Sequence, residues 1–318
     1  MSLTAKFTKR AGDFTLQVDI HAPNGVLALF GPSGSGKSMT LRCIAGVDTP
    51  DEGVIIADGI TVFDSSRRIN LPPQKRRIGL LFQDYALFPI MTVEQNVALA
   101  LGRKDPAQIR EILHRCHVAD VAKLHPRKLS GGQQRRVAFA RMMASDPSMV
   151  LLDEPFSALD ESLSRQMETE LHQQLGFFGG TVVLVSHDRR QVRRLADYIC
   201  VLDNGVTQPV VTAEELFDTP TTRSAALLAG WENFLPLHGD EIQALRSNDF
   251  APQGEIPFIL QVLDVIPEMA GATVVAKTQD NIAVYVAWDH KWDHVPLPKV
   301  GETFTACVNK KDLLHLKG

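Results

Sequence analysis

A glycine-rich segment near the start of the chain has the residue types and the spacing that hold phosphates. It reads Gly31-Pro-Ser-Gly-Ser-Gly-Lys37-Ser38. Glycines let backbone N–H groups close around phosphate oxygens, the lysine reaches the β- and γ-phosphates, and the serine hydroxyl ligates magnesium. The pattern therefore predicts a P-loop that binds ATP and Mg2+. The residues expected to contact the nucleotide here are Gly31, Pro32, Ser33, Gly34, Ser35, Gly36, Lys37, Ser38 and Met39.

Two acidic residues and a histidine follow two further apolar runs. Asp153 and Glu154 come directly after Met149-Val-Leu-Leu, and His187 comes just after Thr181-Val-Val-Leu-Val. Carboxylates in such positions suit a hard cation and the attacking water of phosphoryl transfer. The structural alternative is that the acids are strand-end charges or helix caps and that the histidine only packs.

These motifs, with three others, occur in the order typical of the ATP-binding-cassette (ABC) ATPases. Leu129-Ser-Gly-Gly-Gln133 resembles the family's signature, and Met149 to Glu154 resembles its Walker B strand. Gln83 resembles the Q-loop glutamine, Ser157-Ala-Leu-Asp160 the D-loop, and His187 the switch histidine. The resemblance covers about the first two thirds of the chain.

The resemblance implies a role for each of these residues. Glu154 would hold the attacking water, His187 would contact the γ-phosphate, and Gln83 would complete the shell of magnesium and water. Ser38, Gln83 and Asp153 would be the magnesium ligands, with Asp153 acting through a water. Loss of the glutamate or the histidine would instead indicate a non-hydrolysing ATP binder, but both are present.

The resemblance also implies that two copies of the chain stack head to tail around ATP. The signature of one copy and the helix N-terminus that follows it would meet the γ-phosphate bound by Lys37 of the other. A two-fold interface would repeat this contact twice. The residues expected to contribute to this shared site are Ser130, Gly131, Gly132, Gln133 and Asp160.

The alternation of strand and helix runs up to about residue 228 indicates an α/β sheet of the P-loop type. We expect an ATP-binding cassette over residues 1–230, with a helical subdomain at about 90–145. Short strands separated by proline and glycine predict a small antiparallel β-barrel, regulatory in role, over 231–318. Those strands are expected at Phe258 to Val265, Ala272 to Ala276, Ile282 to Trp288 and Glu302 to Val308.

Composition limits the classes of partner and location. No apolar run approaches the roughly 20 residues of a membrane span, and no apolar signal core is present at the N-terminus. We therefore expect the protein to remain in the cytosol. A net charge of −4 gives no reason to expect nucleic acid as a partner. Four scattered cysteines indicate reduced, space-filling thiols.

A single cassette with a C-terminal β domain resembles the ATPase subunit of bacterial importers, and most of all the molybdate or oxyanion type. The importer group also includes carriers of ferric iron, sulfate, sugars and polyamines. A soluble ABC ATPase acting on nucleic acid is the rival class, but neither paired cassettes nor a coiled-coil insert is present. The implied partners are an integral membrane permease and, indirectly, a periplasmic solute-binding protein. The resemblance to importer subunits also implies a peripheral position at the cytoplasmic face of the inner membrane.

Three local features carry further expectations. Tyr85-Ala-Leu-Phe88-Pro89 is expected to bind the permease through Leu87 and Phe88, the alternative being that both pack beneath the helical insert. The family commonly stacks an aromatic ring on adenine, but the matching stretch is Arg10-Ala-Gly-Asp13, so Phe14 or Phe7 would have to substitute. The segment from Trp288 to His294 is interpreted as an exposed turn rather than a metal site.

Overall fold

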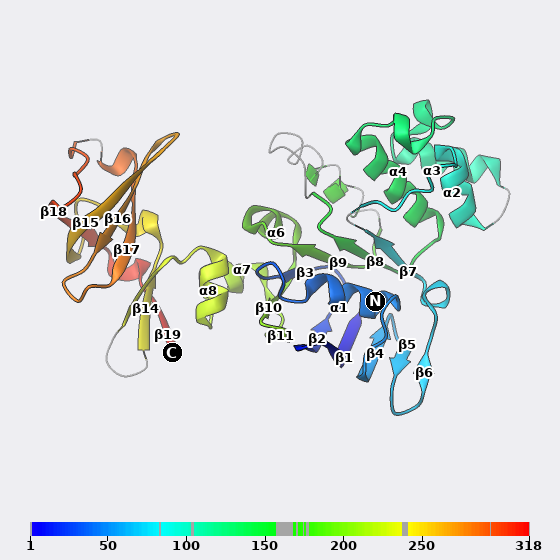
Figure 1. The fold of residues 1–318 in the computed structure, drawn as a ribbon, viewed down its shortest axis with the longest axis horizontal. Helices are drawn as coiled ribbons and strands as arrows, with labels where there is room; N and C mark the ends of the chain where they lie inside the picture. The colour runs from blue at the N-terminus through cyan, green and yellow to red at the C-terminus, as the bar shows by residue number, and fades with distance from the viewer. Residues whose placement is uncertain are drawn as a thin grey trace. The chain divides into compact units, whose positions relative to one another are not determined.

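The structure is a computed structural model that describes residues 2–82, 84–102, 105–156, 168–169, 171–173, 175, 178–236, 241–292 and 294–317. The chain forms two compact units, Met1–Ala213 and Glu214–Gly318 (Figure 1). The unit boundary lies before the boundary expected at residue 230. The division into a 230-residue cassette and a regulatory barrel stays a prediction.

Five parallel strands form the centre of the first unit. They run in the order β10-β3-β9-β8-β7 and pair in parallel throughout. Their nearly continuous apolar sequences, such as Thr-Val-Val-Leu-Val in β9, are typical of strands covered on both faces. The strands are β3 (Val26–Phe30), β7 (Ile78–Leu81), β8 (Met149–Asp153), β9 (Thr181–Ser186) and β10 (Tyr198–Asp203).

An antiparallel part continues the same sheet in the order β6-β5-β4-β1-β2-β11, and β12 pairs with β10. Buried and exposed residues alternate along β2, which is the pattern of a strand with one solvated face. The strands are β1 (Leu3–Ala11), β2 (Phe14–Ala22), β4 (Glu52–Ala57), β5 (Ile60–Asp64), β6 (Ile69–Asn70), β11 (Val206–Thr207) and β12 (Val211–Thr212).

Several of the described helices of the first unit begin at a side-chain cap. Thr92 and Ser130 each form a capping box with a glutamine three residues later, and Asp188 caps the helix after β9. The helices are α1 (Lys37–Ala45), α2 (Val93–Leu101), α3 (Pro106–Arg115), α4 (Gly131–Ala144) and α6 (Arg189–Leu195), with 3-10 turns η1 (Pro73–Lys75), η2 (Ala119–Val121) and η3 (Pro126–Lys128).

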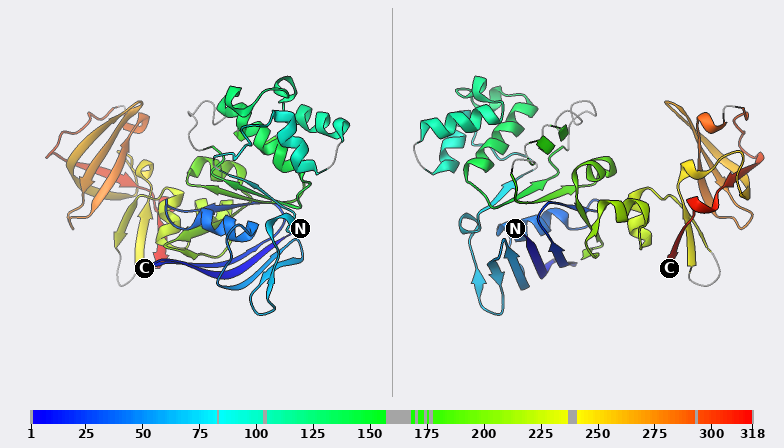
Figure 2. Two further views of the ribbon diagram at one scale, coloured as in Figure 1. Left: turned by 45° about the vertical axis from the view of Figure 1, so that its right-hand side comes forward. Right: turned by 180° about the vertical axis from the view of Figure 1, so that it is seen from behind.

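Two apolar cores lie on opposite faces of the parallel strands. Val150 and Leu152 of β8 pack into one core with α2, α3 and α4. Met149 and Leu151 point into the other core with α1, β1, β2 and β4. This follows from the two-residue period of a strand. The helical cluster and the N-terminal antiparallel strands accordingly lie on different sides of the parallel strands in both views of Figure 2.

The second unit begins with two short helices, α7 (Ala213–Asp218) and α8 (Arg223–Ala229), and continues as antiparallel strands. One sheet has the order β13-β14-β19 and the other β17-β16-β15-β18. Barrel closure stays a prediction, because the described pairings give two sheets. The strands are β13 (Asn233–Pro236), β14 (Glu241–Leu245), β15 (Ile256–Glu268), β16 (Gly271–Lys277), β17 (Ala283–Trp288), β18 (Thr303–Val308) and β19 (Leu314–Lys317), and the 3-10 turns are η4 (Ser247–Asp249), η5 (His290–Trp292) and η6 (Lys310–Asp312).

The expectation of an exposed turn after β17 is wrong for its tryptophans. Trp288 and Trp292 are buried and stack with ring centroids 4.1 Å apart, and Phe304 packs edge-on against both. Burying two indole rings outweighs the turn-forming character of the residues between them. Within the described ranges, no cluster of His, Cys, Asp or Glu could hold a metal ion, and no helix is long and apolar enough to cross a membrane.

Candidate functional site

The glycine-rich loop connects the end of β3 to the start of α1, as the P-loop pattern predicts. A side chain at position 31 would lie 2.1 Å from the carbonyl oxygen of Leu202, so only glycine fits. Gly36 has a φ of 107° at the N-cap of α1, where no side chain caps the helix. The N-terminal N–H groups of α1 therefore remain available to an anion.

Lys37 is the first residue of α1 and lies inside this loop. Its Nζ donates hydrogen bonds to the carbonyl oxygens of Gly31, at 2.9 Å, and Pro32, at 2.7 Å. Only 5% of the residue is exposed. Burial lowers the pKa of Lys37, although the charges of Glu154 and Asp153 oppose that shift. The negative charge of a bound phosphate would stabilise the protonated form of this buried lysine.

Ser38 and Asp153 meet across the loop, although 115 residues separate them in sequence. The Ser38 hydroxyl donates a hydrogen bond of 2.8 Å to Oδ1 of Asp153. Burial is the main reason that the pKa of Asp153 is raised, and the bond to Ser38 opposes it. A hydroxyl beside a poorly solvated carboxylate is the set of hard oxygen donors that Mg2+ prefers, so these residues fit the ion.

Glu154 and His187 meet at the ends of the neighbouring strands β8 and β9. Nδ1 of His187 lies 3.3 Å from Oε1 of Glu154. The backbone N–H of Glu154 donates to the carbonyl oxygen of Val185 at 3.2 Å, which ties the glutamate to β9. Its φ of 42° places it in the left-handed region, an unusual conformation that concentrates at functional sites.

Two predicted site residues lie outside the described ranges. These are Gln83, expected to act at the metal and the water, and Asp160, expected in the D-loop with the rest of residues 157–160. Their roles stay predictions. The parallel strands β3, β8 and β9 bring the other predicted catalytic and metal residues to one edge of the sheet, because the carboxyl ends of parallel strands meet there.

The signature segment forms the N-terminus of α4 in the helical cluster. Ser130 is the N-cap, and its hydroxyl accepts a hydrogen bond from the N–H of Gln133 at 3.3 Å. The side-chain oxygen of Gln133 in turn accepts from the N–H of Ser130 at 3.0 Å. Gly131 and Gly132 are the first two helical residues. The structure thus gives Ser130 and Gln133 a capping role within their own chain.

The two phenylalanines considered for adenine differ in accessibility. Phe7 is buried within the core beside α1, so it is wrong as a stacking platform. Phe14 is half-buried. Cζ of its ring lies 3.2 Å from the position that a Cβ atom would take at Gly36, and 3.1 Å from the same position at Gly205. Phe14 is therefore the ring next to the P-loop.

The loop after the Q-loop position separates its two apolar residues. Leu87 packs against the core of the helical cluster, so the packing alternative holds for it. Phe88 is 43% exposed and lines a groove of about 280 Å³ between β7, α2 and α4. The Phe88 ring lies 5.4 Å from the Arg141 guanidinium.

Two residues that the sequence did not indicate hold this loop. Arg141 donates to the carbonyl oxygens of Tyr85, at 3.1 Å, and Ala86, at 2.7 Å. Both of those residues have positive φ. The amide of the fully buried Asn96 accepts from the N–H of Phe88 and donates to its carbonyl oxygen. An asparagine inside an apolar helix was the available signal, since buried amides need partners.

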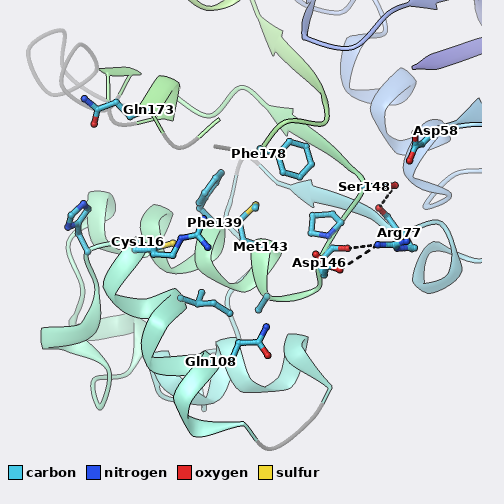
Figure 3. A pocket seen from close by; sticks show the side chains of 15 residues that line it. Asp58, Arg77, Gln108, Cys116, Phe139, Met143, Asp146, Ser148, Gln173 and Phe178 are labelled. Atoms are coloured by element: carbon cyan, nitrogen blue, oxygen red, sulfur yellow. Dashed lines mark hydrogen bonds and ion pairs between the residues drawn. The ribbon is translucent and has the colours of Figure 1, made fainter. Parts of the chain in front are cut away.

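A cavity of about 720 Å³ lies away from these residues. Figure 3 shows it between α3, α4 and the segment that leads into β8, with Phe139 and Met143 on one side and Phe178 on the other. None of the predicted nucleotide residues lines it. The convergence at the ends of β3, β8 and β9 is therefore the better candidate site.

Comparison with known proteins agrees with this geometry. Residues 15–157 match the family model described as ABC transporter. The chain is 40% identical over 239 residues to the spermidine/putrescine import ATP-binding protein PotA of Thermobifida fusca, a match that covers 72% of this chain and 61% of PotA. The sulfate/thiosulfate import ATP-binding protein CysA of Synechocystis is 40% identical over 241 residues, covering 72% and 65%. The chain thus spans less than two thirds of the length of these two relatives.

Longer coverage is found elsewhere. PotA of Nitratidesulfovibrio vulgaris is 37% identical over 270 residues, covering 78% of this chain and 72% of PotA. The solved dimeric structure of the ATP-binding cassette MJ0796 bound to ADP and Pi is 30% identical, with a TM-score of 0.54, and covers 67% of this chain and 98% of that one. The chain therefore belongs to the ATP-binding-cassette transporter family.

Proposed function

We propose that this chain is the ATP-hydrolysing subunit of a bacterial ABC importer. The observation that carries the proposal is the meeting of Lys37, Ser38, Asp153, Glu154 and His187 at one sheet edge. Cation, metal ligand, water-holding carboxylate and histidine are the parts that phosphoryl transfer to water requires. The ABC family and its importer relatives support the same activity.

The chain's own residues would act in sequence on bound ATP. The P-loop N–H groups and Lys37 would bind the phosphates, and phosphate oxygens would replace the carbonyls that Lys37 now contacts. Glu154 would hold a water in line with the γ-phosphorus and accept its proton. His187 would keep the Glu154 carboxylate oriented through their 3.3 Å contact. Gln83 would complete the shell around the water.

Ser38 and Asp153, with Gln83, are the residues that would hold Mg2+. The ion, when bound, neutralises phosphate charge and the charge that develops on the leaving group. The half-buried Asp153 carboxylate is favoured as its partner because partial burial already disfavours its unpaired charge.

We infer that ATP joins two copies of the chain head to tail. The N-terminus of α4 carries a helix dipole and N–H groups that suit an anion, and Ser130, Gly131, Gly132 and Gln133 are located there. In Figures 1 and 2 the helical cluster and α1 lie on different sides of the parallel strands, so a partner's nucleotide is the natural anion for α4. The MJ0796 cassette was solved as a dimer. Asp160 is proposed to contribute to the same interface.

The permease is proposed to bind at the groove that Phe88 lines. Phe88 and Leu99, both exposed, line this groove between β7 and α2, and exposed Ile90 follows two residues after Phe88. A short amphipathic helix fits such a groove through a few apolar anchors. This partner would place the chain at the cytoplasmic face of the inner membrane as a peripheral subunit, with a periplasmic solute-binding protein as an indirect partner.

For the solute, two classes of opposite charge compete. A molybdate-type oxyanion rests on the Asn24-Gly25 approach to β3 and on the single small β domain. The relatives above are named for polyamine and sulfate or thiosulfate import, so they support sulfate or a polyamine rather than molybdate. Calorimetric titration of a solute-binding protein that works with this chain, with molybdate, sulfate and spermidine, would separate these classes.

Phosphate release from ATP by the purified chain tests the activity. Wild type should release phosphate in a Mg2+-dependent manner and Lys37→Ala should not. If the chain releases no phosphate in a Mg2+-dependent manner, either alone or with the permease, the proposed hydrolysis is contradicted. Co-purification with nucleic acid rather than with a permease would favour the soluble rival class.

A further inference from the structure

Arg76 is a buried cation at the opposite end of α1 from the P-loop. Only 2% of the residue is exposed. Its Nη1 donates to the carbonyl oxygens of Cys43, at 2.9 Å, and Ile44, at 2.8 Å, in the last turn of α1. Nε donates to the Leu71 carbonyl at 2.7 Å, and Nη2 donates to Oδ1 of Asn70 at 2.9 Å.

All four acceptors are neutral, and no carboxylate pairs with Arg76 among the described residues. Burial lowers the pKa of its guanidinium, which nevertheless stays charged in proteins. The negative end of the α1 dipole and the carbonyl oxygens of its last turn offset this buried charge. A side chain at Gly46 would lie 2.4 Å from Nε of Arg76, so the end of α1 is shaped around the arginine.

The next residue, Arg77, fixes the start of β8 as Arg76 fixes the C-terminus of α1. The carbonyl oxygen of Arg77 accepts a 2.8 Å hydrogen bond from the N–H of Ser148, the residue before β8. The Arg77 side chain reaches the carbonyl oxygen and the carboxylate of Asp146, as Figure 3 shows. Beyond them β7 and β8 pair from Ile78 and Met149 onward.

These contacts close a ring. Ser38 lies near the N-terminus of α1, and Arg76 is hydrogen-bonded to the C-terminus of the same helix. Arg77 is hydrogen-bonded to the residue before β8. At the end of β8, Oδ1 of Asp153 accepts a 2.8 Å hydrogen bond from the Ser38 hydroxyl. Both α1 and β8 are therefore fixed at the end away from the nucleotide by two consecutive residues. Because α1 and β8 are rigid elements, fixing the end away from the nucleotide also fixes where Ser38 and Asp153 lie.

We propose that Arg76 is a positioning residue that sets how Ser38 and Asp153 meet, and with them the affinity for the divalent cation. This rests on the proposed magnesium site. We expect a larger effect on metal affinity than on ATP affinity. ATP phosphates would contact only the loop and the N-terminus of α1, whereas the metal site also needs Asp153 of β8 to lie beside Ser38. Disturbing Arg76 should weaken the metal much more than it weakens ATP.

The test measures Mn2+ bound to the full chain by electron paramagnetic resonance, with the site saturated by a non-hydrolysable ATP analogue. Arg76→Lys keeps the charge but not the fork of donors. It should weaken Mn2+ binding about tenfold, because about two of the four hydrogen bonds are lost and each is worth about threefold. Asn70→Ala removes one acceptor from an exposed residue and should weaken Mn2+ about threefold. Analogue binding in EDTA should stay near wild type in both variants.

Two control variants decide the result. Arg42→Lys alters an exposed arginine in the same last turn, which pairs with Asp48, and should leave Mn2+ unchanged. Ser38→Ala must weaken Mn2+; if it does not, the proposed metal site itself is wrong. If Ser38→Ala weakens Mn2+ while Arg76→Lys and Asn70→Ala do not, only the positioning role fails. Equal losses of analogue and metal would reduce Arg76 to a structural residue, and if Arg76→Lys does not fold, Asn70→Ala decides.

Discussion

Nδ1 of His187 lies 3.3 Å from Oε1 of Glu154, and this contact joins the ends of two adjacent parallel strands. The glutamate has left-handed backbone geometry, and its N–H is held by Val185 of the strand that leads to His187. Backbone and side chain are thus both fixed from β9. A carboxylate fixed in this way can hold a water without reorganising during the reaction.

Glu154→Gln should bind ATP, lose nearly all turnover and accumulate an ATP-bound dimer. The amide keeps the shape of the carboxylate but accepts no proton, so kcat should fall by about 10² to 10⁴. Phosphate release and size-exclusion chromatography with ATP check both parts. Glu52→Gln, at the exposed first position of β4, is the control. Unchanged turnover in Glu154→Gln would refute the assignment.

Ser130→Arg should block the shared site while leaving the P-loop of its own chain intact. The arginine adds bulk and charge at the N-cap of α4, where the partner's γ-phosphate would dock. Mixed with Lys37→Ala chains, it should form heterodimers in which one composite site keeps both intact halves and turns over. Ser66→Arg, on an exposed turn, should behave as wild type. An ATP-bound dimer without contact between Ser130 and nucleotide would rule out the head-to-tail arrangement.

Phe14→Ala tests the ring beside the P-loop. If Phe14 stacks on adenine, its loss should weaken ATP binding by about 0.5 to 1.5 kcal/mol and remove any preference for ATP over GTP. Phe234→Ala, at a half-buried ring in the second unit, should change neither. A wild-type chain with no ATP preference would instead mean that no ring covers the base.

Phe88→Asp should abolish assembly with the permease and solute uptake, while the isolated chain keeps its fold and basal ATPase. A carboxylate in an apolar groove meets a desolvation cost when the partner binds. Pull-down with the permease and circular dichroism measure the two effects. Ile60→Asp changes a residue of similar exposure on β5 and should assemble normally. Wild-type assembly or an unfolded variant would contradict the coupling role.

The buried thiols should be unreactive at neutral pH and should weaken the fold at high pH. Burial raises the pKa of Cys43 and Cys200 to about 12 and that of Cys116 to about 11. Above about pH 9 the unfolded thiols ionise first, so the free energy of unfolding should fall as pH rises, by up to about 1 kcal/mol per thiol between pH 9 and 10. Urea unfolding of wild type and of single Cys→Ala variants measures this fall. Rapid labelling of native protein by a thiol reagent would contradict it.

Local patterns predicted the central strands and the nucleotide loop because those signals lie within a few residues. Apolar runs such as the one in β9 and a glycine-rich turn need no distant partner to be recognised. The strands of the second unit were predicted for the same reason, apart from β13, β14 and β19. Whether Ser38 would touch Asp153 depended on strand order, which the resemblance implied and the spacing alone did not.

The remaining features depend on contacts between distant segments. Nothing near Phe14 indicates that its ring lies against Gly36, and nothing in the pair Arg76-Arg77 tells the buried arginine from the exposed one. Trp288 and Trp292 resembled a turn because Phe304, the ring that packs edge-on against both, lies in the distant strand β18. Leu87 and Phe88 are both apolar, so the sequence does not show which of them is exposed. Only the packing of the helical cluster distinguishes the packed Leu87 from the exposed Phe88.

The capping box at Ser130 bears on how quickly two chains can associate. The Ser130 hydroxyl accepts from Gln133 N–H, and a hydroxyl that accepts can still donate its own proton. A phosphate arriving from a second chain can therefore be bound without uncapping the helix or fraying its first turn. Association would then require no local refolding step, so its rate should be governed by diffusion and orientation of the two surfaces.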